Sequence, residues 1–176
     1  TAILFAGYGP GKKNVNRNNS IINNEIHDCG QIYWHSPAVF IWQSGGNRIA
    51  NNLIYNTPYT GIVISGPRPQ FFHTKMKGLR ELTGTFNYDE IEDFDVDSDD
   101  WYRFEPYVDS WEKMFKYLFS SDNVVENNEL HHIDMRIDDG NAIYLSGTGY
   151  HNLVCNNYIH DVTSACLHGI IRADDQ

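Results

Sequence analysis

A ten-residue segment recurs along this 176-residue chain at positions 19–28, 47–56, 123–132 and 152–161. Each copy begins with Asn, carries aliphatic residues at its third and eighth positions, and has an Asn pair at its fifth and sixth positions. The first and second pairs lie 28 residues apart, and the third and fourth pairs lie 29 residues apart. A fixed period of this length is typical of solenoids, whose units bury their apolar faces by stacking on one another.

A second segment alternates with the first. It is a short run rich in aliphatic and aromatic residues that ends in Gly, at 2–7, 39–45, 61–66 and 142–147. Such a run is typical of a strand that is followed by a turn. Because the repeated units are strands, we predict an all-β fold. The expected architecture is a right-handed parallel β-helix, a single domain with coils at about 1–66 and 121–176.

The repeat also predicts what its own residues do. Asn tolerates the left-handed backbone region and forms ladders in stacked sheets, so the repeated Asn residues are expected at the corners of the coils. His27, His131 and His160 share one repeat position, which indicates a structural role rather than catalysis or metal binding. Two inward rows are expected, one of Ile21, Ile49, Val125 and Val154 and one of Ile26, Ile54, Leu130 and Ile159.

The coils are interrupted by an insertion at about 67–120, which differs in composition from the repeat. Apolar residues at helical spacing predict an amphipathic helix over 107–119, packed on the flank of the solenoid. The acidic run at 89–100 is expected to be a solvated loop, and a calcium ion held by its alternating Asp residues is the alternative. Otherwise we expect no cofactor. The three cysteines are expected to be buried thiols without a disulfide framework.

The net charge of the chain limits the classes of molecule that it is expected to bind. The formal net charge is −10 and the isoelectric point is about 5.1, which argues against nucleic acid and anionic membranes as partners because both require a basic surface. Aromatic residues make up 14% of the chain, which suits either a core or the binding of sugar rings. Both ends are expected to continue into the remainder of a longer β-helix chain, since open solenoid ends normally carry caps.

Two motifs carry the candidate chemistry, Asp138-Asp139-Gly140 before the strand near 142–146 and a second acidic motif at 168–175. Strand alternation predicts that Tyr144 lies beside Arg172 and that Ser146 lies beside Asp174 on the outer face. Such a row of polar side chains suits the binding of a sugar. An ordinary Asp-Gly turn with charged surface residues is the alternative.

With the Asn-Asn-x-Ile-His segment between them, these motifs resemble right-handed β-helix proteins of the pectate-lyase-like superfamily. Among those, the resemblance is to glycoside hydrolases that act on α-L-fucosides or xylosides. It covers the coils and not the insertion. It implies a secreted or periplasmic enzyme that hydrolyses plant or algal polysaccharide or its oligosaccharides.

In such an enzyme the resemblance assigns the catalytic carboxylates to Asp139 and Asp174. The substrate would be bound by Asp138, Tyr144, His168, Arg172 and Asp175. Asp139 precedes its strand and Asp174 ends the next, so an extended path would separate them by ~15 Å, and a bend before Ala142 is required to bring them together. The alternatives are a polysaccharide lyase or epimerase on the same fold, with Arg172 and His168 as candidate bases, and a carbohydrate-binding solenoid without catalysis.

Overall fold

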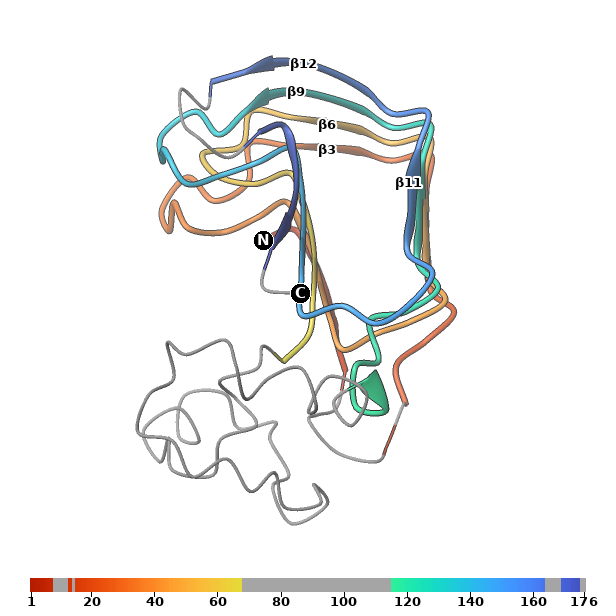
Figure 1. Cartoon of the computed structure of the whole chain (residues 1–176). Coiled ribbons are helices and arrows are strands. Elements are labelled where there is room, and N and C mark those ends of the chain that lie inside the picture. The colour runs from red at the N-terminus through yellow and green to blue at the C-terminus, as the bar shows by residue number, and fades with distance from the viewer. Residues whose placement is uncertain (8–12, 14, 68–114, 164–168, 175–176) are drawn as a thin grey trace, which may run out of the picture.

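The computed structural model describes residues 1–7, 13, 15–67, 115–163 and 169–174 (Figure 1). In these residues the strands form three parallel sheets, and the chain visits the sheets in the same order in every coil. The first sheet contains β1 (Ile3–Ala6), β4 (Val39–Trp42), β7 (Ile62–Ser65), β10 (Ile143–Ser146) and β13 (Ile171–Asp174). The second contains β2 (Ser20–Ile22), β5 (Arg48–Ala50), β8 (Val124–Glu126) and β11 (Leu153–Cys155). The third contains β3 (Glu25–His27), β6 (Leu53–Tyr55), β9 (Glu129–Ile133) and β12 (Tyr158–Val162).

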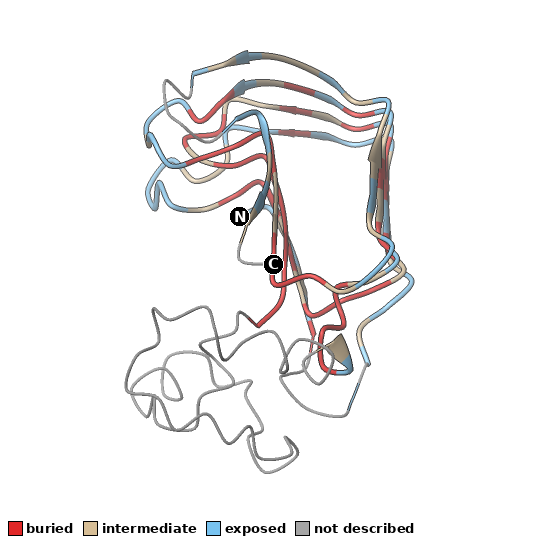
Figure 2. Cartoon of the chain, in the orientation of Figure 1, coloured by how far each residue is buried: buried red, intermediate tan, exposed pale blue. Residues whose placement is uncertain are grey.

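This arrangement is a parallel β-helix, as the repeat predicts. Figure 1 shows the sheets as sides of a stack around one interior, and Figure 2 shows buried residues gathered in the middle coils. The two predicted inward rows are present, because the aliphatic positions of successive copies are paired in register. Val154 and Ile159 are only half-buried, since β11 and β12 are outer strands of their sheets.

Two ladders of Asn side chains run along the coils. In the first, Asn19, Asn47 and Asn123 each donate from Nδ2 to Oδ1 of the next member, at 2.8, 2.7 and 2.9 Å, and the ladder ends at Asn152. In the second, Asn24, Asn52, Asn128 and Asn157 are joined in the same way at 3.0, 2.9 and 2.9 Å. Each acceptor oxygen also receives the backbone N–H of the preceding member. The ladders therefore satisfy polar groups at the corners of the coils.

The first Asn of each pair has a different task. Asn23, Asn51, Asn127 and Asn156 all have φ between 54 and 59°, which is the left-handed region. A residue there turns the chain between the second and the third sheet, and Asn adopts this conformation more readily than most side chains. One member of the pair thus makes the corner, and the other ties neighbouring corners together.

The interruption of the coils falls between β7 and β8. The predicted acidic loop and most of the predicted helix lie outside the described residues. Phe115 is helical, and its ring stacks on Tyr150 with centroids 4.2 Å apart. The buried Gln43 amide donates to the carbonyl of Tyr117 at 2.7 Å and accepts from the N–H of Phe119 at 3.0 Å. This amide ties the returning chain to the coil of β4.

A core truncation tests the stacking. Leu130 is fully buried between Ile54 and Ile159. Replacing Leu130 by Ala should lower the free energy of unfolding by about 2–5 kcal/mol, because the fixed coils above and below cannot close the cavity. Ile159→Ala should cost less, since Ile159 is half-buried. Denaturant unfolding of both variants measures the difference, and equal losses would contradict the coil order described above.

Candidate functional site

Four of the predicted site residues meet on the outer face of the first sheet. The pairing of β10 with β13 sets Tyr144 beside Arg172 and Ser146 beside Asp174, which is the predicted register. The Arg172 guanidinium lies 2.6 Å from Asp174 through Nη2 and 3.7 Å from Asp139 through Nη1. The Tyr144 hydroxyl donates to the same Oδ2 of Asp174 at 3.0 Å, and Arg172 lies 5.7 Å from the centre of the Tyr144 ring.

One guanidinium therefore joins two carboxylates that belong to consecutive coils. Since Asp139 and Asp174 both lie within ion-pair distance of Arg172, their carboxylates are much closer than the ~15 Å of an extended path. A guanidinium is planar and presents its donors as a fork, so it can orient two acceptors at once. The Asp139 side chain is 68% exposed and that of Asp174 is 30% exposed, so solvent reaches both. We call Asp139, Tyr144, Arg172 and Asp174 the carboxylate cluster.

The other predicted site residues are not part of this cluster as described. Asp138 is exposed in the turn beside Asp139. His168 and Asp175 lie outside the described residues, so their predicted role in binding substrate stays a prediction.

The loop that carries Asp139 is held on the preceding coil. The N–H groups of Arg136 and Ile137 donate to the carbonyl of Pro58 at 3.1 and 3.2 Å. Within the loop, the buried carboxylate of Asp134 accepts the N–H of Gly140 at 3.2 Å. A Cβ at Gly140 would collide with that carboxylate, so this position requires Gly. These bonds give the turn before β10 a defined shape.

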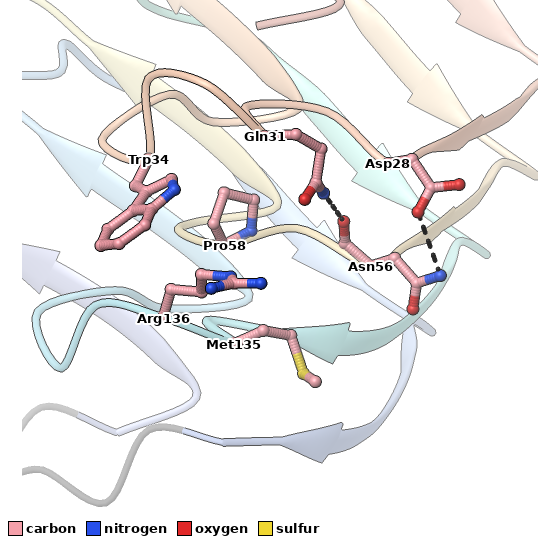
Figure 3. A pocket seen from close by; sticks show the side chains of 7 residues that line it. All are labelled: Asp28, Gln31, Trp34, Asn56, Pro58, Met135 and Arg136. Atoms are coloured by element: carbon pink, nitrogen blue, oxygen red, sulfur yellow. Dashed lines mark hydrogen bonds between the residues drawn. The ribbon is translucent and has the colours of Figure 1, made fainter.

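The structure also has a pocket that the sequence did not predict. It lies among the loops that follow β3, β6 and β9, has a volume of about 480 Å³, and is shown in Figure 3. Its lining combines aromatic, aliphatic, amide and charged groups, namely Asp28, Gln31, Trp34, Asn56, Pro58, Met135 and Arg136. These residues come from three coils, and only Asp28 and Asn56 share a position of the repeat. The one signal available in the sequence is that the loop after the first Asn-pair segment is long and rich in aromatic residues.

The third sheet carries a row of stacked rings on its outer face. His27, Tyr55, His131 and His160 follow one another with ring centroids 4.9, 4.9 and 5.0 Å apart. This confirms that the shared His position is a feature of the stacked coils. A hydrogen bond to Asp161 raises the pKa of His160, with a smaller contribution from Glu129, and the bond to His160 in turn lowers the pKa of Asp161.

The His160–Asp161 pair predicts a pH dependence of stability. Because the pKa of His160 is raised above 6.5 in the folded chain, its contribution is present below that value and is lost as pH rises through the raised pKa. The contribution of Asp161 is present above 3.8 and is lost as pH falls through its lowered pKa. His160→Gln should therefore lower the melting temperature more at about pH 5.5 than at about pH 8. A difference that stays constant with pH would contradict the pairing.

Among the residues that the structure describes, no cluster of three or more His, Cys, Asp or Glu side chains is arranged to hold a metal ion. In the same part of the chain, no helix has the length and apolar character that crossing a membrane requires. Cys29 and Cys155 are half-buried free thiols, and burial raises the pKa of Cys29. Cys166 lies outside the described residues.

Fold and site together define the class of this protein as a parallel β-helix with a carboxylate–arginine cluster on one face and a mixed aromatic and polar pocket beside the loops. Comparisons with protein-family models, with curated proteins and with solved structures find no match to the chain.

Proposed function

We propose that this protein is a glycoside hydrolase that acts on plant or algal polysaccharide, or on its oligosaccharides, through Asp139 and Asp174. The observation that carries the proposal is the guanidinium of Arg172, which lies between the two carboxylates. Glycoside hydrolysis requires a pair of carboxyl groups about 5–5.5 Å apart in retaining enzymes and about 6.5–9.5 Å apart in inverting enzymes. Two carboxylates that share one guanidinium are held at separations of this order.

The two carboxylates have different surroundings, which supports different roles. Asp174 forms an ion pair with Arg172 and accepts a hydrogen bond from the Tyr144 hydroxyl. Its oxygens are therefore oriented in the way that suits a nucleophile or base. Asp139 is more exposed and its contact with Arg172 is longer, which leaves it accessible to the oxygen of a leaving group. We assign Asp139 as the acid and Asp174 as the nucleophile or base. Arg172 and Tyr144 are positioning residues that also lie within reach of sugar hydroxyls.

One experiment distinguishes a hydrolase from a polysaccharide lyase and from a carbohydrate-binding solenoid without catalysis. The full chain is incubated with a panel of aryl glycosides and with plant and algal polysaccharides, and both new reducing ends and ultraviolet absorbance are measured. On the polysaccharides, hydrolysis produces reducing ends without new absorbance, and on the aryl glycosides it releases the aryl alcohol; these are the expected results. Absorbance from an unsaturated product of a polysaccharide would assign the chain to the lyases. Binding of polysaccharide without any product would leave the carbohydrate-binding solenoid.

A further inference from the structure

We propose that the pocket among the loops after β3, β6 and β9 is a glycan-binding subsite that receives a sugar ring carrying an anionic substituent. Trp34 would pack on the ring, Arg136 would bind the anion, and Asp28 would accept hydroxyl groups. The inference deepens the proposed function by naming the class of substrate, and it rests on that function only in taking the ligand to be a carbohydrate.

The shape and lining of the pocket support a sugar ring. Its volume of about 480 Å³ lies within the usual range for small-ligand sites. A pyranose ring has an apolar C–H face and a rim of hydroxyl groups, so it requires an aromatic or aliphatic wall with polar groups at the edge. The pocket supplies this combination, with the walls formed by Trp34, Pro58 and Met135 and the polar groups by Asp28, Gln31, Asn56 and Arg136.

The two ends of the pocket differ in chemistry. Figure 3 shows Trp34 and Arg136 toward one end and Asp28 and Asn56 toward the other. The Asp28 carboxylate is held by the Asn56 amide at 3.3 Å and by the His27 ring at 2.7 Å, and it keeps acceptor capacity because an ionised carboxylate offers about four lone-pair sites. That end is built to accept hydroxyl groups.

The cation at the other end indicates an anionic ligand. The guanidinium of Arg136 lies 5.4 Å from the centre of the Trp34 ring, and no carboxylate of the described residues lies within ion-pair distance of it. By contrast, Arg48 and Arg172 are both paired with carboxylates. The carboxylate of the pocket itself, Asp28, is bonded to Asn56 and His27 and not to Arg136. The Arg136 guanidinium therefore offers its donors to the carboxylate or sulfate of a ligand.

The lining is pre-organised by contacts between coils. The N–H of Met135 donates to the carbonyl of Thr57 at 3.1 Å, and that of Arg136 donates to Pro58 at the same distance. Gln31 donates from its side chain to the carbonyl of Asn56 at 3.4 Å. The backbone that carries Arg136 and Asn56 is therefore fixed before a ligand binds, which lowers the entropy cost of binding.

The test is calorimetric binding with the full chain. The probes are an oligogalacturonate, its carboxyl-reduced neutral counterpart, and a sulfated galactan oligosaccharide. The wild type should bind the oligogalacturonate at least about tenfold more tightly than the neutral counterpart, because a charge-assisted hydrogen bond is lost on reduction. Tight binding of the sulfated probe instead would identify sulfate as the anion and would equally support the subsite.

Variants assign the roles within the pocket. Arg136→Met should abolish the preference for the anionic probes, and Arg136→Lys should retain part of it because the charge remains. Trp34→Ala should weaken the binding of charged and neutral probes alike, by about tenfold. Tyr158→Ala removes an exposed aromatic ring on the third sheet and is the matched control. It should change neither the affinity for the probes nor the preference for the anionic ones. Circular dichroism melts establish that each variant is folded.

The proposal is overturned if the wild type binds the charged and neutral probes equally, or if Arg136→Met keeps the preference. It fails independently of the proposed hydrolysis, because the pocket variants should still hydrolyse small aryl glycosides at the carboxylate cluster. Conversely, Asp174→Asn should leave oligosaccharide binding in the pocket intact. Loss of hydrolysis with retained binding would thus separate the two sites.

Discussion

Asp139→Asn and Asp174→Asn should each lower the turnover of a natural glycoside by roughly two to four orders of magnitude and leave the fold intact. The reason is that an amide can neither transfer a proton to the leaving oxygen nor act as base or nucleophile, although it has nearly the same shape as the carboxyl group. Both side chains lie on the outer face of the solenoid, so neither contributes to the core. Steady-state kinetics of the folded variants measures the effect.

An activated substrate separates the roles of the two carboxylates. An aryl glycoside with a good leaving group needs little protonation, so turnover by Asp139→Asn should be largely restored on it and turnover by Asp174→Asn should not. Asp122→Asn is the matched control, because Asp122 is an exposed residue with φ of 58° that Asn adopts equally well. Near-wild-type rates in both cluster variants would show the pair to be wrong and would make Asp138 and Asp175 the next residues to replace.

Asn128→Ala should lower the free energy of unfolding by about 3 kcal/mol or more. The Asn128 amide is 1% exposed. Its Oδ1 accepts the backbone N–H and the side-chain Nδ2 of Asn52, and its Nδ2 donates to the carbonyl of Ile49 and to Oδ1 of Asn157. Truncation leaves these groups without their partner in the interior of the stack, and each buried unsatisfied group costs about 1–3 kcal/mol.

The end of the same ladder supplies the control. Asn24 makes equivalent bonds to Asn52 and to the carbonyl of Ile22, but it is exposed. Asn24→Ala should therefore cost less than about 1 kcal/mol, because water replaces the lost bonds. Denaturant unfolding of the two variants gives the comparison. If Asn128→Ala were as mild as Asn24→Ala, the ladder would not be a source of stability.

The sequence alone was sufficient to predict the architecture, for a physical reason. In a parallel β-helix each residue contacts its equivalents one coil above and below. Similar residues therefore recur in the sequence at a fixed spacing, and this spacing indicates the fold. The inward rows through Ile54 and Leu130, the Asn corners and the register of Tyr144 with Arg172 all followed from that period. Residues that belong to the repeat were predictable because residues at the same repeat position contact one another in neighbouring coils.

The arrangement of the loops between the strands is not part of the repeat, and it became known only from the tertiary structure. The loops after β3, β6 and β9 differ in length and composition, so no period predicts that Asp28, Trp34 and Arg136 line one pocket. The contact of Asp139 and Asp174 with one guanidinium also involves the loop before β10, which is bonded through Arg136 and Ile137 to Pro58 on the preceding coil and through Gly140 to Asp134. Local sequence specified the stacked strands, whereas contacts between unlike loops of neighbouring coils decided where the functional side chains meet.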